Sequence, residues 1–313
     1  MERRGTAFSL ARAATLDRMD VSRRFLGRDA VLGYLWVTPA LLLLGTLIAY
    51  PFLLALYWSL TSRTAGAAGV FVGLDNFVYL LSGPIFQKTL RNTVVFTACS
   101  VAIKLVIGMA AALVLDQAFR GRNLARGVFL LPWIVPTSLS ALAWLWIYDD
   151  IFGVISRLAM DLGLRREPIP FLSDSVLAMV AVILVNVWRG VSFFAVSFLA
   201  GMQSIPGDLY EAAEADGAGA GGRFWHVTLP GLKPIMAVAT LFSVIWTFSD
   251  FTIVYIVTRG GPANSTHLLA TLAYQTAIFG GKVGEGLAVS SFMFPLLLVV
   301  IFLQLHFLRR YQV

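Results

Sequence analysis

The sequence predicts an all-α membrane protein with six transmembrane helices. Of its 313 residues, 58% are hydrophobic and 13% are charged, whereas a soluble domain has about 25% charged residues. Six stretches reach the length of about 20 mostly apolar residues that a membrane-spanning helix needs, and positive charge is distributed unevenly between the segments that connect them. The spans are expected at residues 33–60, 93–115, 128–148, 176–201, 235–257 and 286–308.

The first span follows an arginine-rich tail, residues 1–30. This could be mistaken for a secretory signal, but the apolar run from Val31 is longer than the 7 to 15 residues of a signal core and lacks a clear small-residue cleavage site. We therefore expect an uncleaved span in a transmembrane domain of residues 31–313, preceded by a cytoplasmic tail that anchors the topology.

A loop rich in turn-forming residues is expected between the first and second spans. Residues 61–91 are expected to form an external loop, with turns at its glycines and at Gly83–Pro84.

The third span contains Pro132 and Pro136. Because proline lacks the N–H donor and is tolerated in a membrane only where neighbouring helices or water compensate, the first half of this span is expected inside the bundle.

Charge fixes the orientation of the bundle. Six crossings place both termini on one side, which carries fourteen Lys and Arg residues, while the longer loops opposite carry eight. The positive-inside rule puts both termini in the cytoplasm. The net charge of +7 is then a consequence of topology, and no nucleic-acid partner is expected. Residues 149–175 and 258–285 become external loops.

The cytoplasmic loop of residues 202–233 predicts a pair of short helices. Ser204 is placed to cap a helix that starts near Pro206, and Gly217 is expected to end it. One face of that helix holds, at helical spacing, Leu209, Ala212, Ala213 and Asp216.

A glycine-rich reversal follows this helix, and Phe224 and Trp225 come after it as two expected exposed aromatic residues. Small residues and exposed aromatics suit docking on another protein. The alternative is an ordinary helix pair that lies on the membrane surface.

Polar residues inside the spans indicate functional positions, because they are unfavourable in lipid. Those that recur at helical spacing in the fourth span are Asn186, Arg189, Gly190 and Phe193. The fifth span shows the same pattern with Ser243, Trp246, Thr247 and Asp250. Each face joins an aromatic ring to hydrogen-bonding groups, which is the combination that a sugar requires.

Structural interpretations of the same residues remain open. Phe193 and Trp246 could belong to the bundle core, and Arg189 and Asp250 could form a structural ion pair. Lys104, in the middle of the second span, could reach toward the interface or pair with an acidic group of a neighbouring subunit.

Several motifs resemble one family. EAAEADGAGAGGRFWHVTLP, from Glu211 to Pro230, resembles the EAA loop of binding-protein-dependent ABC importer permeases, and it stands in the expected place before the penultimate span. GLDNF, LPWIVP, PFLSD, VWRG and TRGGPANST are similar to the carbohydrate-uptake branch. The last motif points to the first permease subunit of maltose or glycerol-3-phosphate type, although Arg259 stands where a small or polar residue is commoner.

The resemblance implies a type I ABC importer permease fold with a cytoplasmic EAA coupling helix. It places the translocation pathway along the fourth and fifth spans. The residues that it implies for contact with the ATPase are Glu211, Ala212, Ala213, Asp216 and Gly217, with Phe224 and Leu229 as supports.

The implied partners are a second, non-identical permease, a cytoplasmic ABC ATPase dimer and an extracytoplasmic substrate-binding protein, together with the lipid bilayer of a bacterial or archaeal cytoplasmic membrane. ATP hydrolysis is expected in the partner, because Gly280–Gly281–Lys282 lacks the spacing and the Ser or Thr of a phosphate-binding loop. No catalytic residue, cofactor or metal site is expected in this chain. A sugar, a disaccharide or a phosphorylated polyol all remain possible as the substrate.

Two other classes of function compete with an importer permease. An intramembrane enzyme needs a convergent catalytic set at membrane depth, but His226 and His267 fall in loops and His306 near a helix end. An ion-driven secondary transporter needs inverted repeats and interrupted helices at matching positions, which the sequence does not show.

Overall fold

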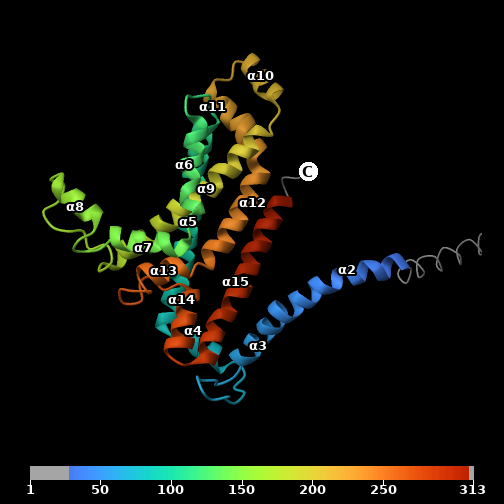
Figure 1. The fold of residues 1–313 in the computed structure, drawn as a ribbon, viewed down its shortest axis with the longest axis vertical. Coiled ribbons are helices and arrows are strands. Elements are labelled where there is room, and N and C mark those ends of the chain that lie inside the picture. The colour runs from blue at the N-terminus through green and yellow to red at the C-terminus, as the bar shows by residue number, and fades with distance from the viewer. Residues whose placement is uncertain (1–27, 310–313) are drawn as a thin grey trace, which may run out of the picture. The chain divides into compact units, whose positions relative to one another are not determined.

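The computed structural model describes residues 28–309, so most of the expected tail of residues 1–30 lies outside the described residues. The chain divides into two units, Met1–Tyr57 and Trp58–Val313. Described residues form helices, with two isolated β-bridges in the segment after the first span. Figure 1 traces the elements by their labels.

The first unit holds α2 (Arg28–Leu44), the π-helical turn η1 (Gly45–Ala49) and most of α3 (Tyr50–Ser59). Together they make a continuous apolar run, Val31–Ser59, that is long enough to cross a membrane. Its π-helical turn ends two residues before Pro51, which has no N–H to donate to the preceding turn.

Three long helices form the centre of the second unit: α5 (Pro84–Asp116), α9 (Ser175–Gln203) and α12 (Leu229–Phe248). Their apolar contacts include Val101, Phe194, Phe198 and Leu232. α5 approaches α9 closely at Gly108, where any added Cβ would collide with Phe194. A small residue at a helix contact is the usual way to achieve such an approach in a membrane.

The third span is broken. α6 (Arg122–Ile134) and α7 (Thr137–Ile147) meet at an angle of 92°, because Val135 is extended and Pro136, with a ψ of 133°, is the non-helical N-cap residue of α7. The span expected over residues 128–148 therefore consists of two helices, in line with the disturbance that its prolines predict. α6 lies against α9, where Ser192 Oγ donates to the carbonyl of Phe129 at 2.6 Å, but no residue of α6 is fully buried.

All three expected external segments contain helices that the sequence did not predict. α4 (Asp75–Ser82) lies in the first, and α5 begins at Pro84, where proline takes the first helical position rather than a turn. The later helices are α8 (Val154–Asp161), α13 (Thr252–Val257), α14 (Leu269–Tyr274), the π-helical η3 (Gln275–Phe279) and α15 (Val283–Arg309).

The loop between α13 and α14 is fixed to α5. Lys88 Nζ donates to the carbonyl of Ala263 at 2.7 Å, and Asn92 Nδ2 donates to that of Asn264 at 3.2 Å. Arg259, the departure from the family pattern, has a φ of 51°. That left-handed conformation is uncommon for a residue with a Cβ.

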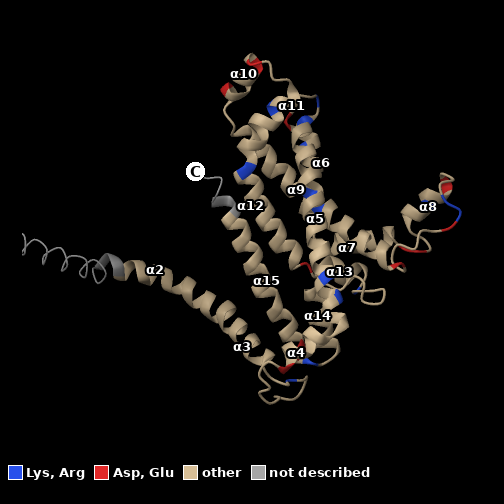
Figure 2. Cartoon of the chain, turned by 180° about the vertical axis from the view of Figure 1, so that it is seen from behind, with Lys and Arg blue, Asp and Glu red and all other residues tan. Residues whose placement is uncertain are grey.

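Five helices of the described chain are long and apolar enough to cross a membrane, and the bent pair α6–α7 makes a sixth. The all-α, six-span prediction is thus confirmed. Within the second unit, α4 lies at one end of the bundle, and the opposite end carries α10 (Gly207–Ala215) and α11 (Ala220–Arg223) (Figure 1). Acidic residues on α10 and basic residues beside α11 mark that end (Figure 2).

Candidate functional site

A small cavity lies between α5, α9 and α12, with α6 at its edge. All eight residues predicted on the fourth and fifth spans line it, and Lys104 and Trp133 complete the lining. The periodicity of each helix predicts which residues share a face, and the packing of α9 against α12 brings the two faces together.

Lys104 connects the three helices. Its Nζ donates to Asn186 Oδ1 on α9 at 2.9 Å and to Thr247 Oγ1 on α12 at 2.8 Å. Asn186 Nδ2 donates onward to Asp250 Oδ2 at 2.9 Å, and Asp250 Oδ1 accepts the backbone N–H of Ile253 at 3.1 Å. Lys104 therefore finds partners inside this chain, which contradicts the interpretation that it reaches toward the interface. Pairing with an acidic group of a neighbouring subunit stays a hypothesis.

Asp250 lies in the break between α12 and α13. It accepts from Asn186 and from the first turn of α13, so the carboxylate connects α9 to the start of α13. Among the described residues, no ion pair within 4.0 Å joins it to Arg189. The expected structural ion pair is thus replaced by a hydrogen bond to an amide.

Arg189 keeps an unused donor. Its Nε is buried and has no hydrogen-bond partner within the described part of the chain. A buried donor without an acceptor is unfavourable, so this guanidinium is a candidate for contact with a bound molecule.

Aromatic rings form the other wall of the cavity. Phe193 lies 5.7 Å from Trp133 and 5.2 Å from Trp246, measured between ring centroids. Trp246 is 52% exposed, which contradicts the core interpretation for this residue, whereas Phe193 is half-buried. Trp133 also lines the cavity; the sequence does not single it out as a site residue, although it lies in the motif LPWIVP.

Gly190 gives Lys104 the space to lie across α9. A Cβ at Gly190 would lie 2.5 Å from Lys104 Cδ, well inside van der Waals contact. Gly190 therefore leaves room for the Lys104 side chain and contributes no side-chain atom of its own to the cavity.

The cavity measures about 60 Å³. Pockets that enclose small molecules are typically about 300–1,000 Å³. In this conformation the chain by itself accommodates one group of a ligand, and a whole sugar needs further surface.

The second candidate region is the hairpin of α10, α11 and the π-helical η2 (Phe224–Thr228). α10 ends where predicted: Gly217 has a φ of 83°, its N–H donates to Glu214 O, and the N–H of Ala218 donates to Ala213 O, both at 2.9 Å. This pair of bonds is the Schellman motif, which favours glycine at the left-handed position.

Two side-chain contacts brace the hairpin. Arg223 Nη1 lies 2.8 Å from Glu214 Oε2, and the hydroxyls of Tyr210 and Thr228 are 3.1 Å apart. The predicted capping role of Ser204 is wrong, because its Oγ donates to the carbonyl of Gly201 in the preceding helix. Pro206 is the N-cap residue of α10, and no side chain caps the helix there.

Exposure separates the predicted coupling residues into two groups. Those exposed are Glu211, Ala212, Asp216 and Gly217, and those half-buried are Ala213, Phe224 and Leu229. Phe224 and Leu229 pack on the apolar cluster of α5, α9 and α12. Only Trp225 of the two expected aromatics is exposed, at 63%.

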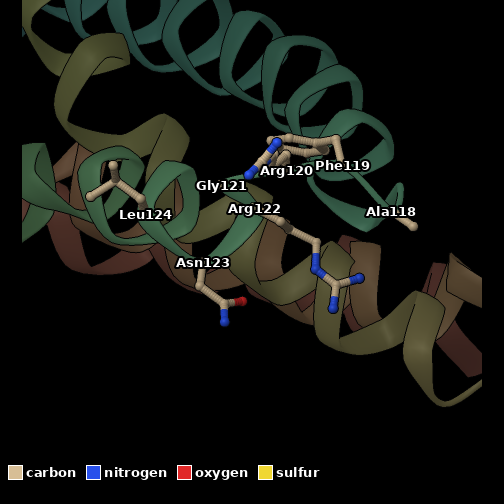
Figure 3. Close-up of a pocket in the computed structure, with 7 residues that line it drawn as sticks. All are labelled: Ala118, Phe119, Arg120, Gly121, Arg122, Asn123 and Leu124. Atoms are coloured by element: carbon tan, nitrogen blue, oxygen red, sulfur yellow. The ribbon is translucent and has the colours of Figure 1, made fainter.

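A larger hollow, about 460 Å³, lies on the loop between α5 and α6 (Figure 3). It is lined by residues 118–124, including Arg120 and Arg122. None of the predicted site residues lines it, and it is separate from the cavity within the spans. No group of three or more His, Cys, Asp or Glu residues suited to a metal ion occurs in residues 28–309.

Residues 104–313 match the family described as the binding-protein-dependent transport system inner membrane component. The trehalose/maltose transport system permease protein MalF of Thermococcus litoralis is 34% identical over 286 residues, which cover 90% of this chain and 96% of that protein. The sulfoquinovosyl glycerol transport system permease protein SmoG of Agrobacterium fabrum is 36% identical over 283 residues, 90% of this chain and 91% of that one.

Among solved structures, a chain of a bacterial ABC transporter involved in import of the acidic polysaccharide alginate shares the fold, with a TM-score of 0.78 at 20% sequence identity. The match covers 94% of this chain and 99% of that chain. A second structure of a bacterial alginate transporter, in complex with a periplasmic protein bound to an alginate pentasaccharide, has the same score.

Proposed function

Because the chain belongs to the family of binding-protein-dependent transport system inner membrane components, we propose that it is one of two non-identical membrane-spanning subunits of an ATP-driven importer for a sugar or a related polyol. The single observation that carries the substrate class is the convergence of eight polar and aromatic residues from two spans on one cavity. Two relatives named for sugar or sugar-derivative transport support it.

The cavity is the proposed passage through the membrane. Asn186 and Thr247 supply hydrogen-bonding groups beside the rings of Phe193 and Trp246, and rings of this kind stack on the C–H faces of a sugar. Since about 60 Å³ is too small for a sugar ring, the second permease supplies the remaining wall and the cavity widens as the subunits alternate between outward and inward openings.

The hairpin of α10 and α11 is the proposed contact with a cytoplasmic ATPase dimer. Its tip presents Glu211, Ala212, Asp216 and Gly217 to solvent, while Phe224 and Leu229 connect it to the packed helices. Small side chains allow close approach, and Glu211 and Asp216 offer carboxylates to basic residues of the ATPase. Nucleotide hydrolysis then belongs to that partner, and this chain is the non-catalytic subunit.

In this proposal the chain lies in a bacterial or archaeal cytoplasmic membrane with both termini in the cytoplasm, and a substrate-binding protein delivers the sugar from outside. Affinity purification of the tagged chain from its native membrane is the first test. We expect a second permease and an ATPase to co-purify, and the reconstituted complex to take up sugar only with ATP and the binding protein.

The competing functions give different results in the same test. A chain that transports by itself in response to an ion gradient would be a secondary transporter, and one that turns over substrate without any ATPase would be an enzyme. Either result would overturn the importer proposal.

A further inference from the structure

The basic side chains at the cavity are not balanced by acidic ones. Lys104 and Arg189 line it, against the single carboxylate of Asp250. Both oxygens of that carboxylate already accept hydrogen bonds, from Asn186 Nδ2 and the N–H of Ile253. Arginine stays protonated in proteins, and no ion pair of Arg189 occurs within the described residues.

The Nε–H group of Arg189 is a buried donor that lacks an acceptor among the described residues. Burying a donor, and a charged one above all, is unfavourable unless an acceptor meets it. The guanidinium presents its N–H groups in a planar fork that matches the oxygens of a carboxylate, sulfonate or phosphate.

The size and walls of the cavity limit what this acceptor can be. Its volume of about 60 Å³ is well below the roughly 300–1,000 Å³ of pockets that enclose small molecules, so it suits one compact anionic group and not a whole sugar. Trp246 at its edge is 52% exposed and lies 5.2 Å from Phe193 between centroids. The ring of a sugar can therefore stack outside the cavity while a charged substituent enters it.

We infer that this site, which rests on the proposed import function, selects sugars that carry an anionic group, whose oxygens accept hydrogen bonds from Arg189 while the ring stacks on Trp246. Lys104 adds a second basic side chain to the same wall. Selection of this kind acts within the membrane and is separate from any selection by the binding protein.

The test uses the assembled importer without its binding protein, so that only the membrane site is probed. Methyl β-D-glucuronide and methyl β-D-glucoside share a ring and differ in a carboxylate against a hydroxymethyl group. Ligand-observed saturation-transfer NMR measures the binding of each. We expect the glucuronide to bind at least tenfold more tightly, Arg189→Gln to abolish the difference, and Arg189→Lys to retain part of it.

Arg157→Gln is the matched control. Arg157 is an exposed arginine on α8, next to Asp161, and its replacement is expected to leave the preference unchanged. Should Arg189→Gln fail to fold, the wild-type preference and the Arg189→Lys variant still decide the question.

Equal binding of the two probes, or binding of neither, by a preparation that performs ATP-dependent uptake would overturn anion selection while leaving the import function intact. Dissociation of the subunits in Arg189→Gln, with the wild type showing no preference, would assign the acceptor to a partner subunit and also overturn it. Absence of ATP-dependent uptake by the wild-type complex would instead count against the proposed function.

Discussion

Lys104 and Gly190 depend on each other at the contact of α5 and α9. The lysine amine is held by Asn186 and Thr247, and to reach them its aliphatic stem crosses α9 where Gly190 has no side chain. An added methyl group there would meet Lys104 Cδ at 2.5 Å. The glycine is thus a consequence of the buried lysine.

This dependence predicts a non-additive pair of substitutions. Gly190→Ala is expected to lower the free energy of unfolding by about 1–3 kcal/mol through overpacking, and to have much less effect when Lys104→Ala has removed the stem. Thermal unfolding of the two single variants and the double variant in detergent gives the coupling. Additive effects would show that the two residues do not collide.

His267 lies buried, at 5% exposed, beneath the loop between α13 and α14. Its Nδ1 is 3.1 Å from Thr271 Oγ1, and Gly260 approaches the ring so closely that any Cβ would collide with it. Burial lowers the pKa of the His267 imidazole below its usual range, because the charged form loses its water.

The lowered pKa of His267 makes the free energy of unfolding depend on pH. In the unfolded chain His267 binds a proton near about pH 6.5, whereas in the folded chain it does so only at lower pH. The contribution of neutral His267 to the free energy of unfolding is therefore complete above about pH 6.5. It is lost as the pH falls from there to the pKa of the folded chain. We expect the melting temperature to drop between pH 7 and pH 5, and His267→Gln to reduce that drop. An unchanged pH profile in the variant would assign the effect to another group.

At the scale of single elements, α10 depends on its C-terminal glycine. Gly217 adopts a φ of 83° so that two N–H groups can close the last turn, and this turn directs the chain into α11 and η2. A β-branched residue is strained in the left-handed region, so its effect should be confined to the hairpin and leave the spans in place.

Gly217→Val is therefore expected to allow membrane insertion while reducing uptake at least tenfold, because the hairpin no longer fits its partner. Gly163→Val is the matched control: Gly163 has a φ of 69°, and like Gly217 it has no atom within 4 Å of an added Cβ, but it follows α8 in the expected external segment. Uptake by reconstituted complexes measures both. Normal uptake with Gly217→Val would remove α10 from the coupling path.

At the scale of the whole molecule, the orientation of the bundle determines which partners its ends can reach. In the proposed orientation, the positive-inside rule places the end with α10 and α11 in the cytoplasm and the segment with α8 outside. The proposed ATPase and the proposed binding protein would then contact opposite ends of the chain.

Cysteine labelling tests this orientation. In a Cys99→Ala background, Leu164→Cys after α8 should react with a membrane-impermeant maleimide in intact cells, and Leu124→Cys should react only after permeabilisation. Both positions are well exposed, at 73% and 74%, so access to the side chain is equal. The opposite pattern would invert the topology and exclude contact of α10 with a cytoplasmic ATPase.

Several elements were predictable because their signals are local. Hydropathy over about 20 residues locates spans, and helical periodicity groups Asn186 with Arg189 and Trp246 with Asp250. Gly217 predicts the end of α10. The break at Pro136 was only half anticipated: proline signals a disturbed helix, but the angle depends on packing against α9. Helices α4 and α14 were missed because they are shorter than the window that identifies spans.

The sequence by itself determined the membrane class, the number of spans and the faces that carry polar residues, since each depends on residues close together along the chain. Only the tertiary structure decided that two of those faces share one cavity, that Lys104 binds Asn186 and Thr247, and that Trp133 joins them. Such contacts join residues as far as 143 positions apart, and hydropathy and periodicity contain no information about distant partners.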